Sequence, residues 1–407
     1  MQGGAFTGFL NAEVTNSEKT ITVTTTLADN LGVKSSRQQQ AYEIMRGMYK
    51  AARPQDMAKL FSLKPVQAKE ALTTIYGGAQ LNQAALIQSD GTVRNAVAAR
   101  LASLPYTMQQ EVTYRPAGFA PGTMEIKAVI PLELDPGNSW WIKTGRVWGS
   151  AAAQQDVPAL KNQNFSVVLG QDRKVDKNWR TGVLLAYSKN ATSSSIVSTT
   201  SQSYDLGLYG GYNREAFDLQ TFLSYGKQSN EARRYLHWQG MIAGSDYRST
   251  ALTFGLGIKY NLHHDSNKLW QISPYAETQI TRYNQNGYSE TGAGSYNQMA
   301  DKLANIYSTG EIGLLLSRSI PGGRYGLSAG YKKVLSGHDP AMTIAFSGNP
   351  QAKMTISGSE QDKEYLVLGF NIQKQVAKDW TITGQMTSER GQKSDTLSAS
   401  LRLQKIW

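Results

Sequence analysis

Few residues of this 407-residue chain have the type and spacing that enzymes use. The run GLSAG at 326–330 matches the Gly-x-Ser-x-Gly pattern of serine hydrolases, in which the serine sits on a sharp turn between a strand and a helix. Here Gly326, Ser328 and Gly330 alternate along a segment that reads as one strand, so they share one of its faces. We therefore expect Ser328 to be a strand residue and not a nucleophile.

The four histidines are the remaining candidates. His263 and His264 stand beside Asp265 in a short turn, but adjacent side chains diverge and no third metal ligand is in view. His237 and His338 fall in expected loops, each with an aspartate nearby in sequence. They leave open a weak alternative, an outer-membrane protease with a loop-borne His–Asp pair. We predict no catalytic, cofactor-binding or metal-binding residues, and therefore no enzyme.

The composition narrows the class of protein. The chain has no cysteine, which excludes a disulfide framework, a thiol nucleophile and a cysteine-ligated zinc site. Its formal net charge of +11 suggests anionic partners such as lipopolysaccharide, but the lysines and arginines are too scattered for a nucleic-acid patch. The mean hydropathy is negative, and no run of about 18 apolar residues exists, which excludes a transmembrane helix. A β-barrel stays compatible, because only alternate strand residues meet lipid.

From about residue 141 onward, apolar and polar residues alternate with a period of two, which indicates strands. Each segment has roughly the ten residues that a tilted membrane strand needs. Twelve such segments lie near 141–150, 164–173, 179–188, 203–213, 216–227, 248–261, 269–282, 307–318, 324–334, 364–375, 379–388 and 395–407.

The connections between these segments alternate in length. KVDKN, NRE, NLHHDSNK, SIPGG and VAKD are short, and long links are expected around 151–163, 189–202, 228–247, 283–306 and 335–363. The last hairpin, RGQKS, is short where a long link is expected. An antiparallel barrel sorts its connections in this way, with tight turns at one rim and loops at the other. A soluble sandwich has no reason to do so.

The two faces of the predicted strands agree with a barrel. In 248–261, apolar residues such as Phe254 and Ile258 alternate with Thr253 and Lys259. In a sandwich the apolar face would cover a second sheet, and in a barrel it would meet lipid. The even strand count, the loop asymmetry and the aromatic residues at strand ends favour the barrel.

The N-terminal part has a different texture. Residues 1–34 read as short strands rich in Thr, Ile and Val. Residues 35–140 read as a helical linker followed by a connector that could hold one hairpin, and residues 141–407 as the barrel. Within the linker, 80–104 is a third helix, in which Val93, Val97, Leu101 and Leu104 make an apolar stripe.

Three stretches stand out along the predicted barrel: FSVVLGQDRKVDKNWRTGVLLAYSKN (165–190), YDLGLYGGYNREAFDLQTFLSYGKQSNEARR (204–234) and ISPYAETQITRYNQNGYSETGAG (272–294). In this order they resemble the second hairpin, the next hairpin and the proline–tyrosine strand of the translocator domains of classical monomeric autotransporters, the proteins of type V secretion. The first has Gly170, Asp172, Gly182 and Tyr187 at the family's places, and the second includes the arginine after the strand. The likeness covers 141–407 well and the linker before it more loosely.

The resemblance implies a twelve-stranded outer-membrane barrel at the C-terminus of a secreted passenger, of whose β region residues 1–34 would be the remnant. It implies barrel ends at the periplasmic rim and a linker that threads the pore, its N-terminus directed to the surface of a Gram-negative cell. Its partners would be outer-membrane lipid and lipopolysaccharide, the barrel-assembly machinery, periplasmic chaperones and its own passenger, and it would be a monomer. The paired asparagines of the self-cleaving subgroup are not evident, so we do not predict autoproteolysis.

The last strand carries the first set of candidate functional residues. Reading back from the C-terminus at every second position, one face is mostly apolar and the other mostly polar. We expect lipid-facing side chains, which the resemblance identifies as the barrel-assembly signal, at Leu397, Leu401, Leu403 and Trp407, and lumen-facing ones at Arg402 and Gln404.

The pore carries the second set. A helix of about 20 residues spans about 30 Å, so the segment 80–104 has the length to fill a lumen that admits about one helix. We hypothesise that Arg94 and Arg100 of this plug meet lumen carboxylates such as Glu277 and Glu311. The alternative, that both arginines are solvated, stays open.

We predict the outer-membrane translocator unit of a monomeric autotransporter, which lets its own N-terminal passenger reach the cell surface. The alternative is an outer-membrane porin or adhesin barrel with an accessory helical domain. The first ten residues, MQGGAFTGFL, contain no charged region followed by an apolar one and so no signal peptide. We therefore expect the natural protein to begin upstream of Met1.

Overall fold

The structure is a computed structural model in which most of the chain is described. The described residues are 4–5, 10–17, 20–27, 36–52, 55–77, 91–101, 106–114, 126–134, 138–154, 157–262, 270–338, 341–357 and 362–407. In these ranges, no helix has both the length and the apolar character to cross a membrane.

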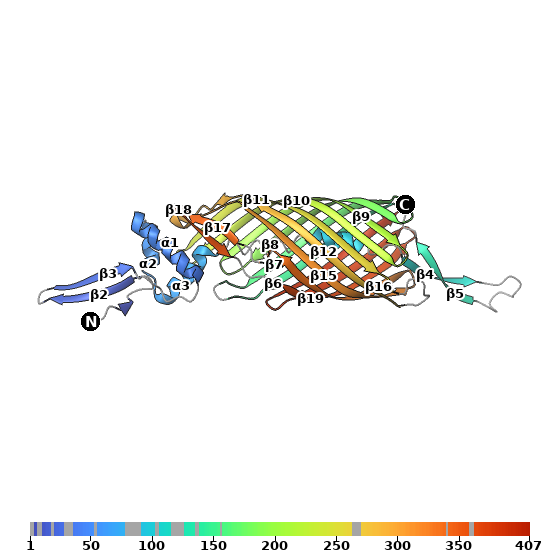
Figure 1. The fold of residues 1–407 in the computed structure, drawn as a ribbon, viewed down its shortest axis with the longest axis horizontal. Coiled ribbons are helices and arrows are strands. Elements are labelled where there is room, and N and C mark those ends of the chain that lie inside the picture. Colours follow the sequence, from blue (N-terminus) through green and yellow to red (C-terminus); the bar gives the residue numbers. More distant parts are fainter. Residues whose placement is uncertain are drawn as a thin grey trace.

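Twelve antiparallel strands close into a barrel (Figure 1). They are β6 (Ser139–Ala151), β7 (Leu160–Lys174), β8 (Trp179–Ser193), β9 (Val197–Arg214), β10 (Phe217–Leu236), β11 (Met241–Tyr260), β12 (Trp270–Gln285), β15 (Leu303–Ile320), β16 (Gly323–Ser336), β19 (Glu364–Ala377), β20 (Trp380–Arg390) and β21 (Ser394–Ile406). The ring closes where β21 pairs with β6, with Ile406 opposite Ser139 at one end and Ser394 opposite Ala151 at the other. The predicted twelve-stranded antiparallel barrel is confirmed.

The alternation in the sequence becomes an apolar outside and a polar inside. Each barrel strand exposes large apolar side chains on its outer face, among them Ile142, Leu169, Leu185, Leu206, Leu223, Phe254, Ile280, Ile312, Leu327, Leu368, Met386 and Leu401. Polar residues one position away point inward and are buried, as Thr253 and Arg402 show. A soluble monomer rarely exposes a continuous apolar belt of this extent, so hydrocarbon tails are the solvent that fits it.

One end of the barrel, which we call the turn rim, has tight connections. Only residues 215–216, 321–322 and 378–379 separate the strands there, and residues 175–178 join β7 to β8. In that last turn, the Asp176 carboxylate accepts hydrogen bonds from the backbone N–H groups of Asn178 and Trp179, at 2.7 and 2.8 Å. These two bonds hold the pKa of Asp176 below its usual value.

At the opposite end, which we call the loop rim, the prediction of a long loop is wrong for two connections. The segments 189–202 and 228–247 are mostly strand, because β8 and β9 are joined only by 194–196 and β10 and β11 only by 237–240. Their residues are too polar for lipid, which is why the sequence suggests loops. An antiparallel ladder satisfies the backbone in water as well as in lipid, so the strands continue beyond the apolar belt.

The two longest connections at the loop rim fold into a small sheet of their own. The first contains β13 (Tyr288–Ser289), the 3₁₀ turn η2 (Gly294–Tyr296) and β14 (Gln298–Ala300), and the second contains β17 (Ala341–Phe346) and β18 (Asn349–Ser357). These four strands pair in the order β13-β14-β17-β18. The sheet gives the loop rim a rigid surface.

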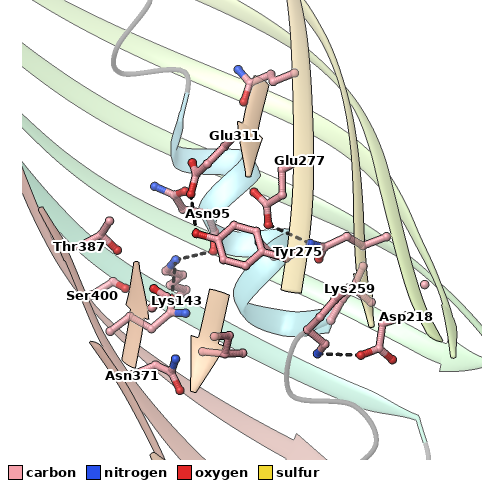
Figure 2. A pocket seen from close by; sticks show the side chains of 18 of the residues that line it. Asn95, Lys143, Asp218, Lys259, Tyr275, Glu277, Glu311, Asn371, Thr387 and Ser400 are labelled. Carbon is pink, nitrogen blue, oxygen red and sulfur yellow. Dashed lines mark hydrogen bonds and ion pairs between the residues drawn. The ribbon is translucent and has the colours of Figure 1, made fainter. Parts of the chain in front are cut away.

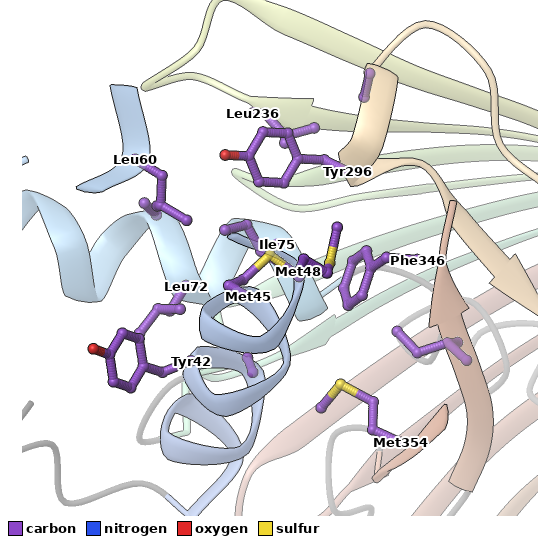
Figure 3. Packing of buried hydrophobic residues seen from close by; sticks show 14 of the residues in the cluster. Tyr42, Met45, Met48, Leu60, Leu72, Ile75, Leu236, Tyr296, Phe346 and Met354 are labelled. Carbon is purple, nitrogen blue, oxygen red and sulfur yellow. The ribbon is translucent and has the colours of Figure 1, made fainter. Parts of the chain in front are cut away.

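A helical unit, residues 36–76, packs on this surface outside the lumen (Figure 1). It consists of α1 (Ser36–Ala52), the 3₁₀ turn η1 (Gln55–Met57), α2 (Ala58–Phe61) and α3 (Pro65–Tyr76). One buried apolar cluster joins helix residues to rim residues (Figure 3); it includes Tyr42, Met45, Met48, Leu60, Leu72 and Ile75 from the helices and Leu236, Tyr296, Phe346 and Met354 from the rim. The sequence had left the place of this segment undecided.

The remaining elements lie along the barrel axis. Helix α5 (Gly91–Leu101) is inside the barrel, drawn in cyan in Figure 1. The hairpin of β4 (Tyr106–Tyr114) and β5 (Ile126–Leu134) projects beyond the turn rim, at the end where the C-terminus lies. A three-stranded sheet of β1 (Gly4–Ala5), β2 (Leu10–Ser17) and β3 (Thr20–Leu27) lies at the other extreme, beyond the helical unit.

Candidate functional site

Helix α5 packs one face against the barrel wall. Val93, Val97 and Leu101 are buried in a cluster with wall residues that include Val168 and Phe222. Their spacing of four residues places them on one side of a helix, so the apolar stripe seen in the sequence is the face that meets the wall. Leu104, the fourth residue of that stripe, lies outside the described residues, as do 78–90 of the predicted plug.

The end of α5 is held by a buried ion pair. Arg100 is fully buried, and its guanidinium donates from Nε to Oδ2 of Asp172 at 2.6 Å and from one terminal nitrogen to Oδ1 at 2.7 Å. The same terminal nitrogen donates to Oγ of Ser139 at 2.8 Å. A two-pronged contact of this kind fixes orientation as well as position, so α5 is registered against β6 and β7 near the turn rim.

The wall surrounds the same carboxylate with further donors. Arg180 on β8 contacts Oδ1 of Asp172 at 2.5 Å, and the Tyr209 hydroxyl on β9 donates to Oδ2 at 2.7 Å. Trp141 on β6 donates from its indole N–H to the Tyr209 oxygen at 2.8 Å. We call Arg100, Asp172, Arg180, Ser139 and Tyr209 the plug anchor. Two cations share one carboxylate there, so the wall keeps an ion pair even when the helix is absent.

Two glycines make room for the aromatic part of this network. A Cβ at Gly170 would lie 2.2 Å from the Trp141 ring, and one at Gly182 would lie 2.3 Å from the Tyr209 ring. No side chain fits at those distances, because protein interiors are already close-packed. Gly170 and Gly182 are two of the positions that resemble the autotransporter family. Their physical role is to let the Trp141 and Tyr209 rings lie flat on the wall beside Asp172.

A second contact holds the middle of the helix. Lys143, which points inward from β6, donates from Nζ to the backbone oxygen of Asn95 at 2.8 Å and to the Gln385 side chain at 3.3 Å. Figure 2 shows Lys143 and Asn95 facing each other across this short gap. The wall therefore also binds the backbone of α5, which does not depend on the side chain at that position.

Beside α5 the lumen keeps a polar cavity of about 340 Å³ (Figure 2). Glu277 accepts a hydrogen bond from Gln220 at 3.2 Å, and Glu311 accepts one from the Tyr275 hydroxyl at 2.9 Å. Wall ion pairs, such as Lys259 with Asp218 at 2.7 Å, line the same space. Charged and polar side chains therefore form part of the lining of the space beside α5.

The predicted plug residues can now be placed. Glu277 and Glu311 line the cavity beside α5, but the ion pair that Arg100 forms in the described part of the chain is with Asp172. The side chain of Arg94 lies outside the described residues, so its proposed contact stays a prediction. The resemblance identifies Asp172 as a motif residue but not as the partner of Arg100, because 72 positions separate the two residues.

The last strand is oriented as expected. Leu397, Leu401 and Trp407 are exposed on the outer face, Leu403 is half-buried there, and Arg402 and Gln404 are buried inside. Trp407 stacks on Trp140 at 6.1 Å between ring centroids, and its backbone N–H donates to the Asn138 oxygen at 3.1 Å. The C-terminal aromatic residue thus seals the barrel seam at the turn rim.

The described members of the rival enzyme sites lie in ordinary structural settings. Ser328 lies inside β16, without the strand–turn–helix context of a hydrolase nucleophile. His237 contacts the backbone oxygen of Ser195 at 2.8 Å and stacks on Tyr235. Among the described residues, no group of three or more His, Asp or Glu side chains could hold a metal ion. His263, His264 and Asp265 lie outside the described residues.

Comparison with known proteins agrees with this geometry. Residues 140–387 match the family model described as "Autotransporter beta-domain". Over 178 residues, 44% of this chain, the sequence is 25% identical to an "Extracellular serine protease" of Serratia marcescens, of which the chain spans only 17%.

Solved structures share the fold. The translocator domain of the autotransporter NalP from Neisseria meningitidis superposes with a TM-score of 0.61, at 15% identity, over 80% of this chain and 98% of that one. The beta domain of the Bordetella autotransporter BrkA superposes with a TM-score of 0.50, at 15% identity, over 67% of this chain and 100% of that one.

Proposed function

Because this chain belongs to the autotransporter beta-domain family and carries its translocator barrel, we propose that the barrel brings the N-terminal part of its own polypeptide across the outer membrane of a Gram-negative bacterium. The observation that supports this most directly is the path of the chain. The helical unit lies at the loop rim, α5 lies in the lumen, and the hairpin β4–β5 lies at the turn rim.

The orientation of the barrel forms part of the proposal. The turn rim, which holds both barrel ends, faces the periplasm, and the loop rim with residues 10–76 faces outward. Short turns on the periplasmic side and loops on the outer side are the usual arrangement of outer-membrane barrels. The passenger, of whose β region residues 1–34 would be the remnant, is exported in this direction.

The role proposed for α5 is that of a plug after export. Its apolar stripe, the plug anchor and the Lys143 contact together hold it in the lumen. A porin with an accessory domain would need an open lumen instead. We expect low conductance from the intact chain in planar bilayers and a clear increase when residues 91–101 are deleted, and equal conductance of the two forms would favour the porin.

The barrel acts as a carrier and not as an enzyme, and it works as a monomer. For its insertion, we propose that Leu397, Leu401, Leu403 and Trp407 form the signal that the barrel-assembly machinery reads, after periplasmic chaperones have delivered the chain. Their outward position on the seam strand supports this, because side chains that face away from the lumen can be contacted from outside while the barrel forms.

The proposed direction can be tested on intact cells. An antibody against the exposed hairpin β2–β3 should label cells without permeabilisation, whereas an antibody against β4–β5 should label them only after the outer membrane is opened. The second antibody is the matched control, since both epitopes are hairpins of the same chain. Labelling in the reverse pattern, or of both hairpins only after permeabilisation, would refute the proposed direction.

A further inference from the structure

A second buried ion pair lies at the loop rim, far from the plug anchor. Arg234, near the end of β10, is 2% exposed and Glu290 is 8% exposed. The guanidinium donates from Nε to Oε1 of Glu290 at 3.1 Å and from a terminal nitrogen to Oε2 at 2.6 Å. That same nitrogen donates to the Tyr296 backbone oxygen at 2.8 Å. These bonds join the β10–β11 hairpin to the loop that carries η2.

The other terminal nitrogen of Arg234 points at a helix end. It donates to the backbone oxygens of Thr74 and Ile75, at 2.9 and 3.1 Å, which belong to the last turn of α3. The final carbonyls of a helix have no partner within it and carry partial negative charge. A buried guanidinium is the side chain best suited to that end, because it brings positive charge and several donors.

Two more rim residues complete the contact. Gln298 donates from Nε2 to the Ile75 oxygen at 2.6 Å, and Trp238 donates from its indole N–H to the Thr74 hydroxyl at 3.0 Å. We call Arg234, Glu290, Gln298 and Trp238 the helix clamp. All four come from the barrel and its loops, and all three donors end on the last turn of α3.

The rim side of the clamp is bonded to itself. The Gln298 backbone N–H donates to Oε2 of Glu290 at 2.7 Å, and the Glu290 N–H donates to the Gln298 oxygen at 2.8 Å. Trp238 packs edge-on against Tyr296, with 5.3 Å between ring centroids. Arg234 therefore keeps its bonds to Glu290 and Tyr296 without the helix, and only one of its terminal nitrogens depends on α3. Such a site is formed in advance of its ligand.

The clamp sits at the end of the helical unit, next to the β8–β9 turn of the barrel. Gly77 follows α3 in an extended conformation and is buried, and a Cβ there would lie 2.4 Å from the Ile196 side chain in the β8–β9 turn. The apolar face of the helical unit is covered by rim residues in the cluster of Figure 3. In the described part of the chain this cover lies at the loop rim, so the helices are held on that side of the barrel.

We propose that the loop rim is a receptor for a helix C-terminus of the same chain, with Arg234 as the capturing residue, and that this capture keeps the exported segment from sliding back into the lumen. The inference rests on the proposed export function. It goes beyond that function by assigning retention to the clamp and not to the plug. Three of the four captured contacts end on backbone carbonyls and one on the Thr74 hydroxyl, so capture depends mainly on a helix end and less on its sequence.

The first test uses the folded protein in detergent. Trypsin cleavage within 36–76 should be about 10- to 100-fold faster in Arg234→Met, since charge-assisted hydrogen bonds that hold the helical unit are lost. The matched control is Arg233→Met, because Arg233 is the adjacent, exposed arginine that contacts only Glu231 among its described partners. Compact migration on an unheated gel shows that the barrel is folded. Equal cleavage rates in the two folded variants would overturn the proposal.

A milder variant covers the case in which Arg234→Met does not fold. Thr74→Val leaves the barrel and its loops unchanged in sequence; it removes the acceptor of Trp238 and the hydrogen bond that the Thr74 hydroxyl donates to the Ala71 oxygen within α3. It should raise the cleavage rate within 36–76 severalfold, with α5 and the barrel unaffected. A cleavage rate equal to that of the parent would count against the clamp.

The second test is made in cells and separates the two proposals. The chain has no cysteine, so Ser17→Cys on the exposed hairpin can be labelled by a membrane-impermeant maleimide. We expect strong labelling in combination with Arg233→Met and severalfold less with Arg234→Met. Equal, strong labelling would overturn retention by the clamp while leaving export intact. No labelling in either would refute export itself, and the trypsin rates would still decide whether the clamp captures the helix.

Discussion

The plug anchor and the helix clamp hold the same chain at the two ends of one lumen, but with the roles of the partners reversed. At the turn rim the threaded segment supplies the arginine, Arg100, and the wall supplies Asp172. At the loop rim the wall supplies both Arg234 and Glu290, and the helix end offers Arg234 only backbone carbonyl oxygens. The first contact therefore depends on one side chain of the plug, and the second depends on a shape that many sequences can form.

The two sites also differ in what remains when the threaded segment leaves. Asp172 keeps Arg180 and Tyr209, and Arg234 keeps Glu290 and Tyr296. Burying a charge is costly unless it is paired. Each wall site is thus paired before the chain arrives, and the barrel can be stable while its lumen is empty.

The largest effect should follow from removing the carboxylate of the plug anchor. Asp172→Ala leaves Arg100 and Arg180 buried together without their shared anion, which should cost about 3–5 kcal/mol of barrel stability. The thermal midpoint of the shift from compact to unfolded migration on gels measures this. The matched control Asp395→Ala removes an exposed carboxylate and should change stability by less than about 0.5 kcal/mol. Equal thermal midpoints for the two variants would mean that the plug anchor does not stabilise the barrel.

Removing the plug's own arginine should separate plug retention from barrel stability. In Arg100→Met the wall keeps its Asp172–Arg180 pair, so the barrel should melt near the parent temperature. The time that single channels spend open in planar bilayers should rise about 10- to 100-fold, because the charged contact that holds α5 is gone. Arg46→Met, on the helical unit, serves as the control. A fall in barrel stability without a rise in conductance would contradict the proposed division of roles.

The packing beside the anchor gives a smaller effect. Gly170→Ala would place a methyl group 2.2 Å from the Trp141 ring, and the required shift should cost about 1–3 kcal/mol. Gly384→Ala is the matched control on another barrel strand, since the nearest atom there is 3.4 Å away. Thermal midpoints in detergent should fall for the first variant only. A midpoint for Gly170→Ala at or above that of Gly384→Ala would show that the ring moves freely.

The smallest effect concerns an exposed ion pair beside the helix clamp. Lys353 and Asp301 are 2.8 Å apart, but their side chains are 55% and 47% exposed. Lys353→Met should therefore change the stability of the loop rim by at most about 1 kcal/mol. Trypsin cleavage of the helical unit is the measurement, with Arg234→Met as the large-effect reference. A comparable effect of both variants would mean that burial does not distinguish the clamp from an ordinary surface pair.

The barrel strands were predictable, because alternation with a period of two is a local signal, and each strand is long enough to show it. Two of the loop assignments failed for the same reason: the local signal in 189–202 and 228–247 is polarity, and polarity marks the edge of the lipid belt and not the end of a strand. The sequence pattern therefore predicts where a strand leaves the lipid belt better than it predicts where the hydrogen-bonded strand ends.

The site was predictable only in part. Helical spacing identified the face of α5 that meets the wall, and charge identified Arg100 as a plug contact. Its partner could not be chosen, since many lumen residues carry a carboxylate and Asp172 lies 72 positions away. The resemblance points to an arginine at the end of the stretch 204–234 without choosing between Arg233 and Arg234, and the ligand of Arg234 is a helix end about 160 positions earlier. No local pattern reports a contact of that kind.

The seam between β6 and β21 gives the molecule a mechanical property. Of the described residues between the helical unit and β6, α5 lies inside the ring formed by the same polypeptide, and the hairpin β4–β5 lies beyond its turn rim. While the helix clamp holds the helical unit at the loop rim and the seam stays closed, this segment cannot leave the ring. Dilution alone does not release it, because both partners belong to one chain; release requires loss of the clamp, opening of the seam or cleavage of the chain.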